Sequence, residues 1–266
     1  MIKSNDIELL SPAGAFESLH AAINAGADAI YFGIDQLNMR ARSSKNFTLK
    51  DLHAIAQITS EQHVKSYLAL NTIIYDDELA HMQTICDAAQ AAGISAVIAG
   101  DISVMSYARS IGLEVHISTQ ANISNIKAVK FYAQFADVMV LARELDLDQI
   151  KYIADQTSQK QIIGPSGHPV RIELFVHGAL CVSISGKCYM SLATKNYSAN
   201  RGECLQTCRR RFRVIDDSSN EELVLDNQFV MSPKDLCMIG FMDELIEAGA
   251  TVFKIEGRGR ASDYIY

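Results

Sequence analysis

The sequence predicts a (β/α)8 barrel, and two patterns lead to that prediction. A helical stretch, a glycine at its C-terminal end and a short apolar strand follow one another at 24–34, 91–100, 110–119 and 247–257. Eight continuous apolar runs, typical of strands buried on both faces, alternate with helical patterns. No G-x-G-x-x-G motif follows the first strand, so a closed, TIM-barrel-like architecture is favoured over an open doubly wound sheet.

The elements follow from these patterns in chain order. The eight expected strands are Ile7–Ser11, Ala29–Ile34, Lys65–Asn71, Ala96–Gly100, Glu114–Ser118, Asp137–Leu141, Arg171–His177 and Thr251–Glu256. The first helix follows Pro12, and the second follows Thr48, which is suited to an N-cap. The expected helices are Phe16–Ala25, Leu49–Gln62, Asp77–Ala92, Ile102–Ser110, Ile123–Phe135, Asp146–Thr157 and Pro233–Ala248.

Residues 1–266 are expected to form a single domain, since barrels of this length are commonly undivided. The main irregularity is a long excursion after the seventh strand, which we interpret as an insertion at 178–232. In a barrel it emerges at the C-terminal face, where active sites lie. After the eighth strand the chain continues for ten residues, GRGRASDYIY, of which RASDYIY could begin a helix. We therefore expect the last helix to be truncated or absent, as in a piece of a longer protein.

Composition and charge narrow the function classes. Apolar residues make up 48% of the chain, yet no run approaches the roughly 18 residues of a membrane span. The N-terminus leads into a strand without a signal-like segment, which together with six cysteines predicts a reducing, cytoplasmic location. The net charge of −7 argues against a general nucleic-acid binder.

The charge is unevenly distributed. Between Cys181 and Arg213 seven basic residues face one acid, so this segment carries +6 and the rest of the chain −13. The segment is either a solvated loop whose cations offset thiolate charge, or a docking patch for a phosphate backbone or an anionic substrate.

Four cysteines lie within 28 residues, at Cys181, Cys188, Cys204 and Cys208. Clustered thiols in a reducing compartment typically bind metal. Six, fifteen and three residues separate consecutive cysteines, so the sequence lacks the paired C-x-x-C motifs of a zinc ribbon. Four thiolates on an irregular loop suit a [4Fe–4S] cluster. Zinc stays open as the alternative, whereas a single catalytic thiol would leave three cysteines unexplained. The two others, Cys86 and Cys237, are expected in the core, although Cys237 could replace a ligand.

Polar residues gather at the expected strand ends, where a barrel enzyme needs them. Arginines there suit the recognition of carboxylate or phosphate, although an ion pair inside the barrel or a structural histidine would produce the same pattern. The set is Asn38, Arg40, Arg42, Asn71, His116, Ser118, Gln120, Arg143, Glu144, Glu173, His177, Lys254, Glu256 and Arg258.

Several segments resemble one known family. ELFVHGALCVSISGKCYMS (173–191) resembles the double-cysteine signature of the collagenase-like peptidase family U32. ELLSPAG, AGADAIYFG, HISTQAN, VLARELDL, NRGECLQTCRRRF and VFKIEGR resemble that family in the same order, across essentially the whole chain. The peptidase label has no assigned catalytic residue, and the sequence holds no G-x-S-x-G, H-E-x-x-H or ordered Ser/His/Asp set.

The resemblance implies iron–sulfur chemistry. Better-understood members hydroxylate without molecular oxygen, acting on tRNA wobble uridine, a ribosomal RNA cytidine or the ubiquinone precursor ring. RNA-modifying members require prephenate, which implies a prephenate-derived co-substrate. By position, the cluster ligands would be Cys181, Cys188, Cys204 and Cys208, and retention of all four favours the RNA-modifying branch. Full-length relatives continue past the barrel, often into a β-rich domain, so a C-terminal region is expected to be missing.

The leading hypothesis is an iron–sulfur-dependent RNA hydroxylase that converts tRNA wobble uridine to 5-hydroxyuridine. A peptidase acting on collagen-like peptides and a cluster-bearing redox or scaffold protein stay open as alternatives. The expected pocket residues are Arg42, Asn71, Gln120, Arg143 and His177. The expected contacts to the RNA backbone are Arg209, Arg210, Arg211 and Arg213.

Overall fold

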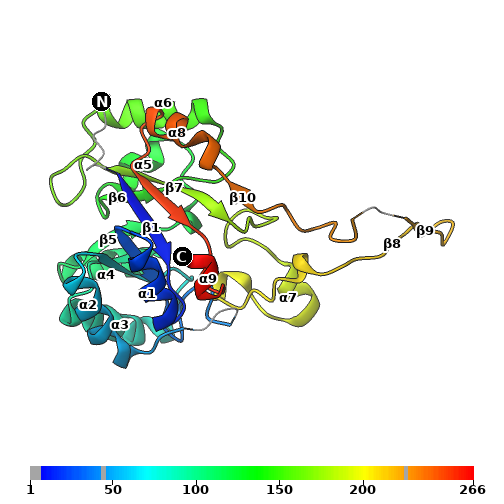
Figure 1. Cartoon of the computed structure of the whole chain (residues 1–266), viewed down its shortest axis with the longest axis horizontal. Helices are drawn as coiled ribbons and strands as arrows, with labels where there is room; N and C mark the ends of the chain where they lie inside the picture. The colour runs from blue at the N-terminus through cyan, green and yellow to red at the C-terminus, as the bar shows by residue number, and fades with distance from the viewer. Residues whose placement is uncertain (1–6, 43–45, 225–226) are drawn as a thin grey trace.

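The computed structural model describes residues 7–42, 46–224 and 227–266. Eight parallel strands form a closed barrel, because β6 pairs with β7 in addition to the neighbours that each has in an open sheet. The predicted fold class is therefore confirmed (Figure 1). The barrel strands are β1 (Glu8–Pro12), β2 (Ala29–Phe32), β3 (Lys65–Leu70), β4 (Ala96–Ala99), β5 (Glu114–Ile117), β6 (Val138–Val140), β7 (Arg171–Gly178) and β11 (Val252–Ile255).

Helices follow most strands and cover the outside of the barrel (Figure 1). Gly93 ends one of them with a φ of +83°, the left-handed conformation that the glycine pattern predicts. The helices of this layer are α1 (Phe16–Asn24), α2 (Leu52–Glu61), α3 (Leu79–Ala92), α4 (Ile102–Ser110), α5 (Ile126–Tyr132), α6 (Leu147–Gln159), α8 (Met242–Glu247) and α9 (Ser262–Ile265). None of the helices in the described ranges has the length and hydropathy needed to cross a lipid bilayer.

Two predicted helices begin later than the sequence suggests. The helix expected at Ile123–Phe135 begins at Ile126, because the Asn125 side chain accepts hydrogen bonds from the second and third backbone N–H groups. The prediction of a helix at Pro233–Ala248 is wrong for the first half of that range. There β10 (Leu236–Cys237) pairs antiparallel with the end of β7, and a 3-10 turn at Ile239–Phe241 precedes α8. Pairing with β7 overrides the local helical pattern.

The core has two layers, as the alternation of strand side chains requires. Tyr31, Tyr67 and Ile98 belong to the apolar cluster inside the barrel. Their neighbours in sequence, such as Ile30 and Leu68, face the helices and join the larger outer core. This packing fixes the strand ends that carry the polar residues of the C-terminal face.

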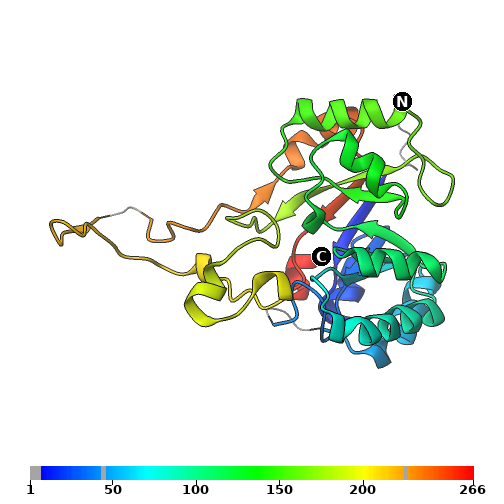
Figure 2. The same ribbon diagram turned by 180° about the vertical axis from the view of Figure 1, so that it is seen from behind.

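The predicted insertion leaves the barrel after β7. It holds α7 (Met190–Lys195), two 3-10 turns at Ala199–Arg201 and Thr207–Arg209, and the antiparallel pair β8 (Val214–Ile215) and β9 (Glu222–Leu223). Its first part folds back beside the barrel, whereas the β8–β9 pair lies at the end of a long arm that points away from it (Figures 1 and 2). Residues 225 and 226 of the predicted insertion lie outside the described ranges, as do the first six residues.

Candidate functional site

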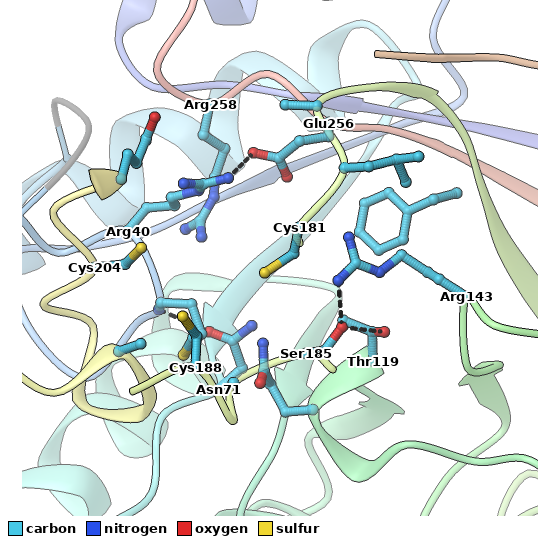
Figure 3. A pocket seen from close by; sticks show the side chains of 18 of the residues that line it. Arg40, Asn71, Thr119, Arg143, Cys181, Ser185, Cys188, Cys204, Glu256 and Arg258 are labelled. Atoms are coloured by element: carbon cyan, nitrogen blue, oxygen red, sulfur yellow. Dashed lines mark hydrogen bonds and ion pairs between the residues drawn. The ribbon is translucent and has the colours of Figure 1, made fainter. Parts of the chain in front are cut away.

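A cavity of about 160 Å³ lies at the C-terminal face of the barrel. Strand-end residues form its floor, and the returning part of the insertion forms the opposite wall. All four clustered cysteines line this cavity. Figure 3 shows Cys181, Cys188 and Cys204 around one space, with Arg40 and Arg258 on one side and Arg143 on the other. The insertion and the barrel thus build one site.

The four thiols come from separate turns of the insertion. Cys181 is exposed, and Cys188, Cys204 and Cys208 are half-buried. Burial raises the pKa of the Cys208 thiol, the other three cysteines raise it further and the Arg209 guanidinium lowers it. The sulfur atoms are therefore close enough to influence one another electrostatically. Within the described ranges, no three Cys, His, Asp or Glu side chains are arranged to hold a single metal ion.

The remaining two cysteines differ from each other. Cys86 is fully buried in α3, as predicted, and burial raises the pKa of its thiol to about 12. Cys237 was expected in the core, and this is wrong: it is exposed on β10 and does not line the cavity. β10 is an edge strand that pairs with β7 outside the closed barrel, so the barrel does not enclose Cys237.

A network of buried charges forms one side of the cavity. Arg40 donates to Glu256 at 2.8 Å, and Arg258 donates to the Asn38 side-chain oxygen at 3.0 Å. Burial by itself raises the pKa of Glu256, but Arg40 and Arg258 outweigh it and hold the pKa below its usual range. Burial also lowers the pKa of Arg258, whose Nε has no hydrogen-bond partner.

A second ion pair lies deeper, between Lys254 of β11 and Glu173 of β7. The two charged atoms are 2.7 Å apart, and the side chains are only 4% and 0% exposed. The ammonium group also lies 4.5 Å from the centre of the Tyr31 ring. This is the internal ion pair that the sequence suggested. It leaves one Glu173 oxygen without a hydrogen-bond partner.

Polar side chains also line the opposite side. Arg143 donates to the Ser185 hydroxyl at 2.7 Å, which lies 3.2 Å from the hydroxyl of Thr119 (Figure 3). Asn71 accepts from the backbone N–H of Met39 at 3.1 Å. These bonds tie the cysteine-bearing loop and the β2–α2 connection to the ends of β3, β5 and β6.

Gln120 packs directly against Gly186, between Cys181 and Cys188. A Cβ atom at Gly186 would lie 1.9 Å from the Gln120 side-chain oxygen, and the glycine has a φ of +73°. The positive φ favours glycine at this position, and a methyl group would also displace the end of the Gln120 side chain. The loop between the first two cysteines is thereby held close to the end of β5.

Three of the five expected pocket residues meet in the cavity. Asn71, Gln120 and Arg143 line it, whereas Arg42 and His177 do not. Arg42 instead pairs with Glu203 at 3.1 Å and lies over the Tyr197 ring. The register between β7 and β11 shifts at the end of both strands, so the inward alternation from Glu173 does not extend to His177. The side chain of His177 stacks near Tyr264 of α9, with ring centres 5.9 Å apart.

Four charged residues of the broader strand-end set replace those two. Arg40, Lys254, Glu256 and Arg258 line the cavity. The i, i+2 spacing of Lys254, Glu256 and Arg258 could have predicted that they line the cavity together, because alternate residues of a strand share a face. No such periodicity distinguishes Arg40 from Arg42 in the irregular segment after β2.

The basic run after Cys208 is divided by the structure. Arg209 lines the cavity, whereas Arg210, Arg211 and Arg213 are exposed at the start of the arm. Arg211 lies over the Phe229 ring at 5.6 Å, and Arg213 pairs with Glu222 across the β8–β9 pair. Of the four, Arg209 is turned inward.

This chain is similar in sequence to known proteins of one family. Residues 14–266 match the model of peptidase family U32. The chain belongs to this family. It is 57% identical over 262 residues to a protein named collagenase from Porphyromonas gingivalis, a match that covers 98% of this chain and 63% of that protein. The U32 chain thus spans less than two thirds of the length of such relatives.

Other relatives of this U32 chain modify RNA. It is 36% identical to the 23S rRNA 5-hydroxycytidine C2501 synthase of Escherichia coli, covering 99% of this chain and 38% of that protein. It is 31% identical to the tRNA hydroxylation protein P1 of Bacillus subtilis, covering 97% of this chain and 60% of that protein. The solved structure of the U32 peptidase Mk0906 has the same fold, with a TM-score of 0.59, 11% identity and coverage of 97% and 96% of the two chains.

Proposed function

We propose that this U32 chain carries the cluster-binding barrel of an oxygen-independent RNA hydroxylase, which converts tRNA wobble uridine to 5-hydroxyuridine. One observation carries the proposal: the four cysteines line the same strand-end cavity as a group of cationic side chains. The relatives that modify rRNA and tRNA support the choice of RNA as substrate. The proposal joins a redox centre, an anion site and an RNA surface on one face of the barrel.

Cys181, Cys188, Cys204 and Cys208 would hold a [4Fe–4S] cluster, with one thiolate for each iron. Their placement fits this group, since four thiols from different turns face a single cavity. The cluster, when bound, supplies one-electron transfer beside the substrate. The pKa of Cys208 is raised overall, chiefly by burial, and the neighbouring Arg209 guanidinium partly opposes this rise.

The cations of the cavity would bind an acidic co-substrate, which we take to be prephenate-derived. In the described part of the chain, five cationic side chains line the cavity against one carboxylate, Glu256. Lys254 is neutralised by Glu173, whereas Arg258 and Arg143 each keep a buried Nε without a partner. Arginine presents several donors in a fixed plane and suits bidentate binding of a carboxylate. Asn71 and Gln120 supply amide groups that can orient an uncharged base.

The proposed reaction replaces the C5–H bond of uridine with C5–OH. If the oxygen atom comes from water, the change releases two electrons and two protons, so an electron acceptor must turn over with the cluster. If the oxygen comes from the acidic co-substrate, that molecule is reduced as the base is oxidised. In the second case the cavity has to hold the base and an anion together, and its arginines would bind the anion.

The exposed arginines at the start of the arm would hold the RNA backbone. Arg210 and Arg211 leave the cavity wall beside Cys208 and are open to solvent. Phosphate contacts of this kind fix the position of RNA without reading its sequence. The acidic remainder of the chain would keep RNA on this face.

Nucleoside mass spectrometry tests the proposal in the whole protein. Deletion of the gene should remove 5-hydroxyuridine from tRNA, the gene carrying Cys237→Ser should restore it, and the gene carrying Cys188→Ser should not. Loss of a hydroxylated nucleoside from ribosomal RNA alone would overturn the tRNA assignment. Unchanged tRNA and rRNA would overturn RNA hydroxylation altogether.

A collagenase-like peptidase is the second candidate, because a relative at 57% identity bears the name collagenase. It predicts that the purified protein cleaves gelatin and that Gln120→Ala, which removes a cavity amide but no cysteine, abolishes cleavage. Cleavage that persists in Gln120→Ala would not come from this cavity.

A further inference from the structure

Arg209 differs from the arginines that follow it, because its guanidinium group is bonded inside the protein. One terminal nitrogen donates to the Leu180 carbonyl oxygen at 2.5 Å. The other donates to the Ser232 hydroxyl at 2.6 Å and to the Pro233 carbonyl oxygen at 2.8 Å. A single side chain therefore joins three stretches of the insertion that are far apart in sequence.

Two of those stretches carry cysteines. Leu180 immediately precedes Cys181, and Arg209 itself immediately follows Cys208. The third stretch, Ser232–Pro233, is where the chain returns from the arm toward β10. We infer that Arg209 is a positioning residue: it holds the turns of Cys181 and Cys208 at a fixed separation and anchors the base of the arm to them.

Few regular backbone bonds support this part of the molecule. The β8–β9 pair joins only two residues on each side, and it lies out along the arm. Near the cysteines the backbone forms short turns, such as the bond from the Arg209 N–H to the Gln206 carbonyl oxygen. Among the described residues, a backbone bond from the Phe212 N–H to the Gln228 carbonyl oxygen also joins the two limbs of the arm, and the guanidinium group adds three bonds between the cysteine-bearing turns and the returning chain. Without the guanidinium group, the carbonyl groups of Leu180 and Pro233 lose a charged donor in a half-buried site.

The geometry calls for arginine in particular. Three acceptors around one planar group match the donor fork of a guanidinium, whereas a lysine ammonium is a single point charge on a flexible stem. Arg210 provides a matched control within the chain, since it is the next residue, carries the same charge and is exposed. Arg210→Ala controls for the loss of an arginine next to Cys208, and Arg209→Lys, which keeps a positive charge at the same position, controls for electrostatic effects on the site.

Cluster retention is the first test, and it rests on the proposed function. Arg209→Ala, Arg209→Lys and Arg210→Ala would be reconstituted anaerobically, and the loss of iron to a chelator would be followed by absorption. Arg209→Ala should lose iron roughly tenfold faster than the parent, since it removes several charge-assisted hydrogen bonds. Arg209→Lys should lose iron at a rate between those of Arg209→Ala and the parent, and Arg210→Ala should lose it at the parent's rate. Added methylguanidinium should slow the loss of iron from Arg209→Ala.

Hydrogen–deuterium exchange of the cluster-free proteins is the second test, and it does not depend on the proposed function. Peptides covering 179–183 and 231–236 should exchange faster in Arg209→Ala than in Arg210→Ala, while barrel peptides exchange equally. Exchange that differs as expected in a protein that binds no iron would keep the positioning role and reject the cluster. Equal exchange at both peptides, or equal iron loss from Arg209→Ala and Arg210→Ala, would overturn the inference. If Arg209→Ala does not fold, the same comparisons with Arg209→Lys decide it.

Discussion

Replacement of Lys254 by methionine should destabilise the barrel by about 3–5 kcal/mol. Methionine keeps the length of the side chain and its packing against Tyr31 and Phe175, but it leaves the Glu173 carboxylate buried without a counter-charge. That carboxylate is fully buried, and one of its oxygens already has no hydrogen-bond partner. Adding Glu173→Leu to Lys254→Met should restore most of the lost stability, because replacing both members of a buried ion pair by apolar groups often changes the free energy of unfolding little.

Urea unfolding of the cluster-free protein at neutral pH, followed by circular dichroism, measures both effects. Lys65→Met is the matched control, since its ammonium group pairs with Glu8 at 2.9 Å but the side chain is 55% exposed. It should cost less than about 1 kcal/mol. A Lys254→Met variant as stable as Lys65→Met, or a double variant no more stable than Lys254→Met, would refute the reasoning.

Three further outcomes are expected. Burial by itself raises the pKa of Glu8, but Arg171 and neighbouring donors outweigh it and lower the pKa to about 2. The stabilisation of about 3 kcal/mol is present above the unfolded pKa of 4.5 and lost as the pH falls through 2, so Glu8→Gln should flatten this part of the urea-midpoint profile. Gly186→Ala should lower the iron content per chain, because a methyl group there collides with a neighbouring amide at a positive φ. The pair Arg210→Ala and Arg211→Ala should weaken RNA binding and reduce its salt slope by about 2, with iron content unchanged in filter-binding and iron assays.

The barrel strands could be predicted because burial on both faces leaves a continuous apolar run, and Ala96–Ala99 is an example. The helices before β2, β4, β5 and β11 end beside a glycine in the left-handed conformation, as at Gly93. The strand β10 could not be predicted. Its two residues form a strand only because β7 extends beyond the barrel and offers an edge to pair with.

The cysteines of the candidate site could be predicted because their clustering is a property of the sequence alone. The inward-facing cations could be predicted only in part. Lys254 and Glu256 follow strand alternation, whereas the choice between Arg40 and Arg42 depends on how an irregular segment packs. A register shift removed His177 from the expected set. The sequence does not distinguish Arg209 from the arginines that follow it, because its three acceptors lie in segments far from it in sequence.

Iron and acid-labile sulfide analysis of anaerobically purified protein tests the central claim most directly. We predict about four iron and four sulfide per chain, since each thiolate of the set would serve one iron. Both should be lost in Cys188→Ser and retained in Cys237→Ser, whose thiol lies on β10 away from the cavity. Zinc at one equivalent per chain, or iron that survives replacement of all four cavity cysteines, would contradict the account.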